Sequence, residues 1–375
     1  MDDEARETGG LDRARETAPR ARHRGGRRAP YGQSRHNEAG ENGGRASATY
    51  AALDLGTNNC RLLVARPTAD GFHVVDAFSR IIRLGEGMSA SGRLSEAAIT
   101  RAVQALAICR DKMCNRAVTR TRLIATEACR IAENGADFRA RVAEEVGLEL
   151  EIVDRETEAT LAASGCTPLL DPQAEGVILF DIGGGSSELV RLGPARPSPR
   201  GPAPPDIVGW ISIPVGVVTL AERHGGVKVS REIYENMVSE VAGFIVRFAA
   251  EHHLRGLGAI HLLGTSGTVT TIAGVHLELK RYERRYIDGC WMTDGQISKV
   301  MERLLAMSYE DRVANPCIGA ERADLVLAGC AIFEAIRRAF PCQRVRVADR
   351  GLREGMLVQM MRADGVWAGA GDGAS

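Results

Sequence analysis

The chain has 375 residues, 44% of them hydrophobic, so it is long enough to bury a large core and is expected to form two or three domains. Its 48 basic and 48 acidic side chains cancel, which excludes a bulk electrostatic attraction to nucleic acid or to an anionic membrane. The sequence shows neither about 18 uninterrupted apolar residues nor an apolar leader, which predicts a cytoplasmic protein without a membrane span.

The first 48 residues predict a disordered tail. They contain ten arginines and eight acids but almost no large apolar side chains, so they bury too little surface to offset the entropy lost on ordering. At the other end, residues 363–375 predict a short flexible tail. Between the tails we expect two lobes, residues 49–170 and residues 171–362.

Short apolar runs alternate with helical patterns between the tails, which is typical of an α/β protein. Helices are expected from Ser95 to Met113, with Ser95 as the N-cap, and from Ser230 to His252, which carries one apolar stripe. Six of the 14 prolines lie between Pro194 and Pro205 and predict a surface loop that joins two strands. Strands are expected at residues 49–54, 61–65, 122–125, 150–153, 176–181, 187–190, 259–263 and 345–348.

A local motif occurs twice. The stretch DLGTNNCRLLV begins at Asp54, and the stretch DIGGGSSELV begins at Asp181. Each copy places an acid at the end of an apolar strand, then a turn of small residues, then a second apolar strand. The repeat predicts two related halves that face a shared cleft.

The second copy carries the stronger chemical signal. Glycine lets a ligand approach the backbone closely, so the amides of its turn form a candidate phosphate cradle. A turn centred on its glycines makes Asp181 and Glu188 cross-strand partners, and two like charges opposite each other favour a bound cation such as Mg²⁺. The alternative is a plain hairpin with a solvent-facing Glu188. The candidate phosphate-binding residues of this turn are Gly183, Gly184, Gly185 and Ser186.

The first copy has a similar turn, but a different residue faces its acid. Asp54 ends the strand, and the mirror position across the turn is Arg61, which compensates its charge. A structural salt bridge therefore remains open beside a phosphate-binding role for the turn. The candidate binding residues here are Gly56, Thr57, Asn58 and Asn59.

Three further candidates lie between the two copies. Arg130 follows a predicted strand by one helical turn, near a strand carboxyl end where α/β proteins bind ligands. Glu156 and Glu158 begin a predicted helix, where acids also complement the helix dipole. The two acids point to different helix faces, so at most one faces the cleft, and spacing alone does not select it.

Two later motifs are weaker. The stretch HLLGTSGTVTTIAG predicts a strand, a small-residue turn and a helix start, which suits either a phosphate cradle or helix capping by Ser266 or Thr268. Near the C-terminus, Arg350, Arg353 and Glu354 surround a glycine at a predicted helix start. Interaction and capping remain open for these three residues.

Taken together, the motifs resemble those of the exopolyphosphatase and guanosine pentaphosphate phosphohydrolase family over about residues 49–362. In the order found in that family, the chain carries DLGTNNCRLLVA, ATEACR, DRETEA, ILFDIGGGSSELV, IPVG, LLGTSGTVTTIAG and GLREGM. The resemblance implies an actin-like, ribonuclease-H-like fold of two lobes with a cleft between them. It also implies a hydrolase that releases terminal phosphate from inorganic polyphosphate, from guanosine pentaphosphate, or from both.

The same resemblance implies a role for each candidate. Glu158 matches the base that activates water, and Arg130 matches an arginine that contacts the phosphate chain. Asp54, Asp181 and Glu188 match acids that hold Mg²⁺, with Mn²⁺ as an alternative ion, and the two turns match phosphate-binding loops.

Some residues depart from the family pattern. Thr57 and Asn59 replace small serines of the first turn, and the family's EEA motif is TEA here. These departures bear on substrate preference more than on the reaction. The expected partners are the phosphate substrates, with no nucleic acid or membrane and with a homodimer left open. The competing hypotheses are a small-molecule kinase of the same fold, whose GTSGT turn seats adenosine, and a non-catalytic sensor of guanosine tetraphosphate or polyphosphate.

Overall fold

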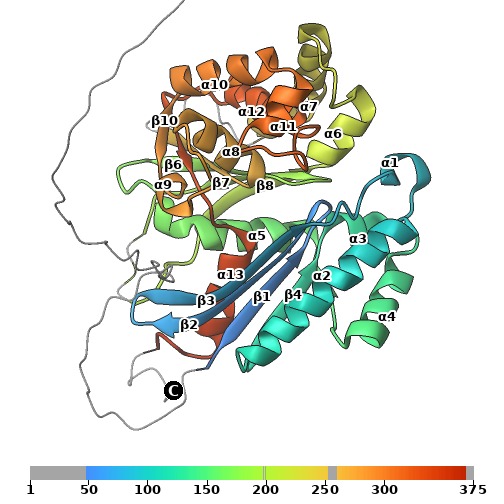
Figure 1. Ribbon diagram of the computed structural model, residues 1–375. Helices are drawn as coiled ribbons and strands as arrows, with labels where there is room; N and C mark the ends of the chain where they lie inside the picture. Colours follow the sequence, from blue (N-terminus) through green and yellow to red (C-terminus); the bar gives the residue numbers. More distant parts are fainter. Residues whose placement is uncertain (1–47, 197, 199, 252–259, 369–375) are drawn as a thin grey trace, which may run out of the picture. The chain divides into compact units, whose positions relative to one another are not determined.

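The computed structural model describes residues 48–196, 198, 200–251 and 260–368 (Figure 1). The predicted N-terminal tail lies outside this part except for Ala48, which packs at the edge of a core. Of the predicted C-terminal tail, residues 369–375 also lie outside it.

The first sheet has five strands in the order β3-β2-β1-β4-β5. Its central strand β1 pairs antiparallel with β2 and parallel with β4, and its side chains are almost all buried. The edge strand β3 was not predicted, because its residues are mostly half-buried or exposed and give no apolar run. The strands are β1 (Tyr50–Leu55), β2 (Asn59–Thr68), β3 (Gly71–Ile81), β4 (Arg120–Ala125) and β5 (Glu151–Ile152).

The second sheet has six strands in the order β10-β11-β9-β6-β7-β8. Here β6 pairs antiparallel with β7 and parallel with β9, so the run β8-β7-β6-β9 repeats the run β3-β2-β1-β4 of the first sheet. The predicted relation between the two halves is confirmed. The strands are β6 (Gly176–Ile182), β7 (Ser187–Leu192), β8 (Ile207–Ile213), β9 (Ile260–Thr265), β10 (Trp291–Thr293) and β11 (Arg344–Val347).

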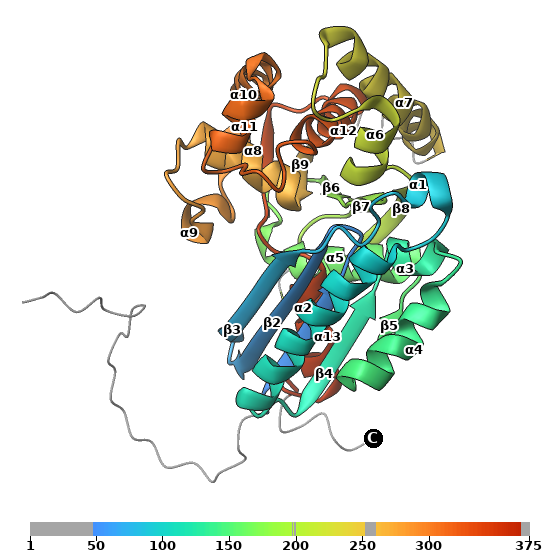
Figure 2. The same cartoon turned by 45° about the vertical axis from the view of Figure 1, so that its right-hand side comes forward.

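Helices cover both faces of each sheet (Figures 1 and 2). On the first sheet, α2 and α4 bury one face and α13 the other. The helices that follow the first strands are α1 (Met88–Ser91), α2 (Glu96–Asn115), α3 (Glu127–Ile131), α4 (Gly135–Val146) and α5 (Arg155–Cys166), followed by a 3-10 turn (Thr167–Leu169). The later ones are α6 (Val217–His224), α7 (Arg231–Glu251), α8 (Gly267–His276), α9 (Arg284–Ile287), α10 (Asp294–Ala306), α11 (Tyr309–Ala314), α12 (Val326–Ala339) and α13 (Leu352–Ala363).

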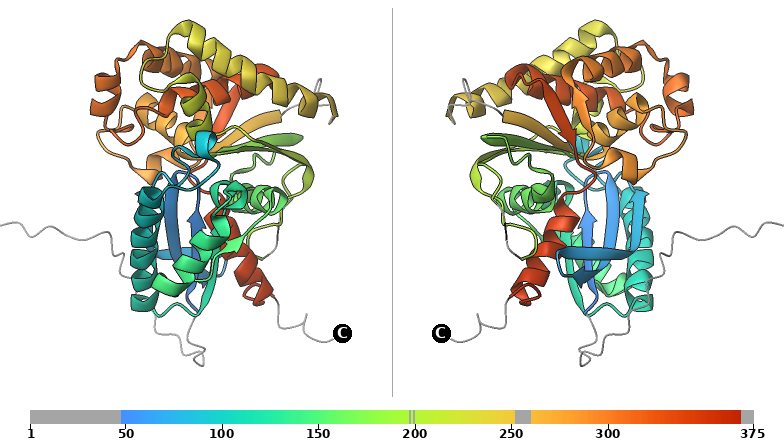
Figure 3. Two further views of the ribbon diagram at one scale, coloured as in Figure 1. Left: turned by 90° about the vertical axis from the view of Figure 1, so that its right-hand side faces the viewer. Right: turned by 90° about the vertical axis from the view of Figure 1, so that its left-hand side faces the viewer.

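Two helices form the layer between the sheets (Figure 3). Helix α5 packs on the second sheet, α13 packs on the first, and the two helices contact each other. Their contact needs glycine, because a Cβ on Gly165 would lie 1.9 Å from the carbonyl oxygen of Gly351 and one on Gly355 would lie 1.9 Å from that of Leu161. Residues 352–362 of α13 fall within the range expected for the second lobe. By its contacts it belongs with the first sheet.

The structure agrees with the predicted N-cap of α2, the predicted apolar stripe of α7 and the predicted proline-rich loop. Ser95 caps α2 by accepting a hydrogen bond from the amide of Ala98 at 3.3 Å, as expected for an N-cap serine. In α7, Met237, Val241 and Ile245 of the predicted stripe are fully buried against the second sheet. The proline-rich loop joins β7 to β8 as predicted. In the described part of the chain, no helix is long and apolar enough to cross a membrane.

Candidate functional site

The first turn connects β1 to β2. The register pairs Asp54 with Arg61, as the sequence predicted, and the amide of Gly56 donates to the carbonyl of Asn59 at 2.9 Å to close the turn. Burial raises the pKa of Asp54, while the positive charges of Arg61 and Arg353 act to lower it. The first turn therefore supplies its own partial charge compensation.

The second turn connects β6 to β7 and pairs Asp181 with Glu188, again as predicted. The hydroxyls of Ser186 and Ser212 each donate to one oxygen of Glu188 at 2.8 Å. Burial raises the pKa of Asp181 to about 6, and burial together with the charge of Asp181 raises that of Glu188 to about 7. Two carboxyl groups thus face each other with neutral donors beside them, which leaves local negative charge for a cation.

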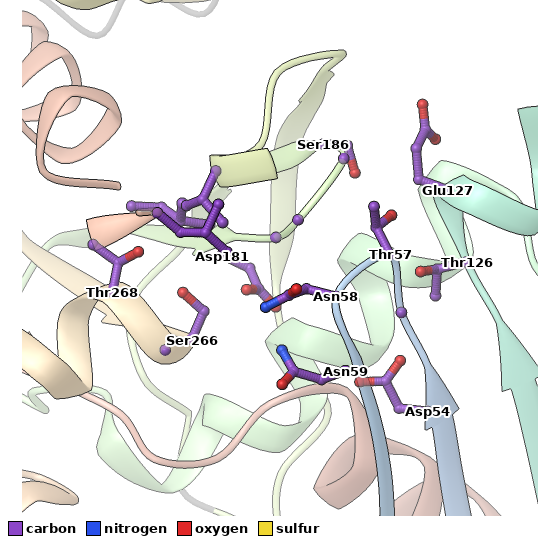
Figure 4. Close-up of a pocket in the computed structure, with 18 of the residues that line it drawn as sticks. Asp54, Thr57, Asn58, Asn59, Thr126, Glu127, Asp181, Ser186, Ser266 and Thr268 are labelled. Carbon is purple, nitrogen blue, oxygen red and sulfur yellow. The ribbon is translucent and has the colours of Figure 1, made fainter. Parts of the chain in front are cut away.

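The two turns touch each other across the cleft (Figure 4). A Cβ added to Gly184 would lie 3.0 Å from Cβ of Thr57, and one added to Gly185 would lie 2.8 Å from Oγ1 of Thr57. Only residues without a side chain allow this approach, which is the physical reason for glycines at these positions. The cleft has a volume of about 120 Å³. The predicted site residues that line it are Asp54, Gly56, Thr57, Asn58, Asn59, Glu158, Asp181, Gly183, Gly184, Gly185, Ser186 and Glu188.

The structure distinguishes the two acids that begin α5. Asp154 caps this helix by accepting from the amide of Thr157 at 2.7 Å. Glu158 then faces the cleft with its side chain 14% exposed, whereas Glu156 is exposed and does not line the cleft. Burial and the nearby charge of Glu188 raise the pKa of Glu158 well above its ordinary value. A proton acceptor with a raised pKa therefore lies in the same cleft as the paired acids.

Arg130 lies behind this acid and is not among the residues that line the cleft. One terminal nitrogen donates to Glu158 at 3.2 Å, and the other donates to the carbonyl of Val153 at 2.5 Å. The guanidinium also forms a close ion pair with Glu127. Arg130 is thus held against the candidate base, and any contact with a ligand needs a change in these partners.

Glu127 is a buried acid of the cleft that the sequence analysis did not single out. Its side chain is 4% exposed and accepts from Arg130 and, at 2.8 Å, from Arg155. Burial acts to raise the pKa of Glu127, but the hydrogen bonds from Arg155 and Arg130 outweigh burial and hold the pKa below its ordinary value. The sequence feature that could have identified Glu127 is its place in the ATEACR motif, just after the end of β4.

Two arginines supply positive charge in the cleft. Arg61 and Arg322 both line it, and no residue in the described ranges forms a salt bridge with either. Burial and the like charge of Arg61 lower the pKa of Arg322. Half-buried arginines in a cleft that form no salt bridge indicate an anionic ligand. Arg322 follows no recognisable sequence motif, and the sequence pattern indicates Arg61 only as the partner of Asp54.

Three polar atoms of the cleft have no hydrogen-bond partner among the described residues. They are Oδ1 of Asn58, Oδ1 of Asn59 and Oγ of Ser266, and all three are buried. Ser266 precedes α8 at a left-handed φ of 89° and makes no capping hydrogen bond, so of the alternatives left open for this turn, helix capping by Ser266 does not occur. Buried polar atoms without partners are costly, and a ligand or water in the cleft would satisfy them.

A wider trough continues from the cleft. It has a volume of about 580 Å³ and shares Arg61 and Arg322 with the cleft. Arg353 and Tyr282 lie farther along its wall. Glu354 is also there, but it accepts from the amide at the start of α13 at 2.9 Å and so has the capping role left open above.

The carboxylates of the cleft suit a magnesium ion only in combination with other ligands. Within the described ranges, no three His, Cys, Asp or Glu side chains gather closely enough to hold an ion by themselves. Mg²⁺ in proteins usually keeps several waters and takes one or two carboxylates plus phosphate oxygens. The opposed pair Asp181 and Glu188, with the unpartnered amide oxygens of Asn58 and Asn59 in the same cleft, fits that habit.

Comparison with known proteins agrees with this architecture. The model of the Ppx/GppA phosphatase family matches residues 63–364. A Ppx/GppA family member from Aquifex aeolicus is 28% identical, with 84% of this chain and 98% of that chain covered and a TM-score of 0.69. An exopolyphosphatase-like protein is 27% identical, with 85% and 99% covered and a TM-score of 0.75.

An exopolyphosphatase from Cytophaga hutchinsonii, at 22% identity, has the same fold, with 84% and 98% covered and a TM-score of 0.75. The predicted actin-like fold of two lobes is therefore confirmed. The chain belongs to the Ppx/GppA phosphatase family and is a phosphatase.

Proposed function

We propose that this phosphatase hydrolyses the terminal phosphoanhydride bond of inorganic polyphosphate, of guanosine pentaphosphate, or of both. The main support is the contact between the two turns, which brings a small-residue turn from each lobe to one small cleft that contains Arg61 and Arg322. Guanidinium groups beside two turns of small residues match the charge on the oxygens of a terminal phosphate. The trough beyond the cleft has room for the remainder of such a substrate.

Glu158 is the proposed general base. It faces the cleft, and burial raises its pKa, so it is a better proton acceptor than an exposed glutamate. In our proposal its carboxylate orients a water molecule and takes one proton from it as the water oxygen attacks the terminal phosphorus. The bond from phosphorus to the bridging oxygen breaks, and the shortened substrate leaves with that oxygen.

Arg130 holds the base in place from behind. Its Nη2 donates to the Glu158 carboxylate at 3.2 Å and also pairs with Glu127, while Nη1 donates to the carbonyl of Val153. The role in phosphate contact that the resemblance implies for Arg130 requires it to turn from these acids toward the substrate. A phosphate chain with several negative charges is the kind of ligand that competes for such a guanidinium.

A divalent ion is part of the proposal. Asp181 and Glu188 would hold Mg²⁺, or Mn²⁺, with Asp54 facing them from the first turn. When bound, the ion would neutralise charge on the transferring phosphoryl group. Without a bound ion, Asp181 and Glu188 face each other and both have raised pKa values.

The test is phosphate release measured side by side on long polyphosphate, tripolyphosphate and guanosine pentaphosphate, with Mg²⁺ and without any acceptor. Release from at least one of these substrates is expected. Consumption of ATP only in the presence of a sugar or an organic acid would instead support the kinase hypothesis. Tight binding of guanosine tetraphosphate with no turnover under saturating Mg²⁺ would support the sensor hypothesis.

A further inference from the structure

A second set of polar contacts joins the two lobes, between the loop that follows β3 and residues of the second lobe. Arg83, in the loop between β3 and α1, donates from both terminal nitrogens to the carboxylate of Asp324 at 2.8 and 2.9 Å. It also donates to the carbonyl of Glu321 at 3.1 Å. From the same loop, the amide of Gly87 donates to the carboxylate of Glu222 in α6 at 2.8 Å. We name Arg83, Gly87, Glu222 and Asp324 the interlobe clasp.

The first half of the clasp is built onto the first turn. The amides of Ile82 and Arg83 donate to the carbonyl of Asn58 at 2.9 and 3.1 Å, and the amide of Gly85 donates to that of Thr57 at 2.9 Å. A Cβ on Gly85 would lie only 2.4 Å from Cγ2 of Thr57, so any other residue would force the Thr57 side chain to shift. The loop is therefore hydrogen-bonded to the first turn along its length.

The second half of the clasp is built onto the second turn and the arginine side of the cleft. Helix α6, which carries Glu222, begins with an amide of Val217 that donates to the carbonyl of Gly183 at 3.0 Å. Asp324 lies two residues after Arg322, which lines the cleft. The clasp consequently connects the phosphate-facing parts of both lobes.

The backbone around Arg83 indicates that this position is under constraint. Its φ is 47°, which is uncommon for a residue other than glycine. Arg101 of α2 holds the loop in this shape by donating to the carbonyl of Ile82 and to the carboxylate of Glu86, both at 2.8 Å. Backbone strain of this kind concentrates at functional positions. Here it directs the Arg83 side chain across to the other lobe.

We infer that Arg83 and Asp324 are positioning residues of the phosphatase, which hold the two turns at the separation at which both grip one terminal phosphate. This inference rests on the proposed function for the identity of the ligand. A planar arginine fork on a carboxylate sets distance and orientation together, which a single hydrogen bond does not. Without the fork, a smaller fraction of molecules has a closed cleft, and the apparent affinity falls by that fraction.

The variant Asp324→Asn tests the inference with tripolyphosphate as substrate. We expect KM to rise about tenfold while kcat stays within about threefold, because saturating substrate still closes the cleft. The exchanged pair Arg83→Asp with Asp324→Arg should recover most of the wild-type KM, since aspartate tolerates the left-handed backbone at position 83. A merely structural ion pair would lower the melting temperature and leave KM unchanged.

The matched control is Asp364→Asn. Asp364 accepts the same kind of fork, from Arg120 at 2.9 and 2.8 Å, but this pair lies within the first lobe. Hydrogen exchange without substrate gives a second readout, in which Asp324→Asn should speed exchange in residues 54–61 and 181–188 and the control should not. If Asp324→Asn matches the control in KM and exchange, the inference is overturned. If the wild type cleaves no phosphate substrate, the proposed function fails, and exchange alone still decides the clasp.

Discussion

The two turns of the cleft share one architecture and differ in the residue that faces the acid. In the first turn Arg61 lies opposite Asp54, and in the second turn Glu188 lies opposite Asp181. The first turn therefore compensates part of its own charge, whereas the second accumulates negative charge in a buried place. The same hairpin thus occurs twice, and in our proposal the second copy holds a cation whereas the first carries the guanidinium of Arg61.

The largest effect should come from Glu188→Gln, which keeps an oxygen to accept from Ser186 and Ser212 but removes the charge. We expect phosphate release with saturating Mg²⁺ to fall by about 10²-fold or more, because the proposed ion would lose one of its two carboxylate ligands and would no longer be held where it neutralises the transferring phosphoryl group. Without metal the free energy of unfolding should rise, because two like charges no longer face each other. Enzyme assays and urea unfolding with a chelator measure the two effects.

The equivalent change in the first turn, Arg61→Gln, should have the opposite sign in the unfolding experiment. Asp54 would stay buried with less positive charge nearby, so the free energy of unfolding should fall. If both variants destabilised the metal-free protein, the contrast between the two turns would be incorrect.

The second-largest effect should be a dependence of the free energy of unfolding of the metal-free protein on pH. The pKa values of Asp181 and Glu188 are about 6 and about 7 in the folded state, above those of the unfolded chain. Their contribution to stability is therefore fully present below about pH 4 and is lost as the pH rises through 6 to 7. A shift of about two units corresponds to about 3 kcal/mol for one group.

Urea unfolding from pH 4 to 8 with a chelator measures this loss. Glu188→Gln should lose less stability than the wild type over that range, and Mg²⁺ should reduce the loss in the wild type. Parallel curves for the two proteins would contradict the assignment of the effect to this pair.

A smaller effect concerns the contact between the turns. In Gly185→Ala the new methyl group would meet Oγ1 of Thr57 at 2.8 Å and Cγ of Glu127 at 3.1 Å, so the turns should be forced apart. We expect a loss of about 1–3 kcal/mol in unfolding free energy and a higher KM. In Gly56→Ala the nearest atom is 3.5 Å away, and the change should stay within about 0.5 kcal/mol. Equal effects of the two alanines would show that the turns do not depend on this contact.

The sequence predicted both hairpin registers because they depend on local spacing. Side chains alternate with a period of two along a strand, so an acid at each end of a short turn determines its cross-strand partner. The paired Asp181 and Glu188 follow from that rule alone. Glu158 was selected over Glu156 only by the resemblance to a family, and the structure places Glu158 at the cleft.

The features that the sequence did not predict depend on contacts between distant residues. Arg322 reaches the cleft from a segment without a motif, and Arg83 meets Asp324 across 241 residues. Helix α13 packs on the first sheet although the second lobe precedes it in the chain. Periodicity describes which face of an element is buried, but it does not indicate which distant element covers that face.

In the proposed function, Glu158 activates water beside the two turns. The most direct measurement is single-turnover phosphate release from tripolyphosphate by Glu158→Gln, with Glu156→Gln on the same helix as the matched control. The account predicts that Glu158→Gln slows release by about 10²- to 10⁴-fold with little change in substrate affinity, while the control keeps the wild-type rate. Release by Glu158→Gln at the wild-type rate would contradict the account.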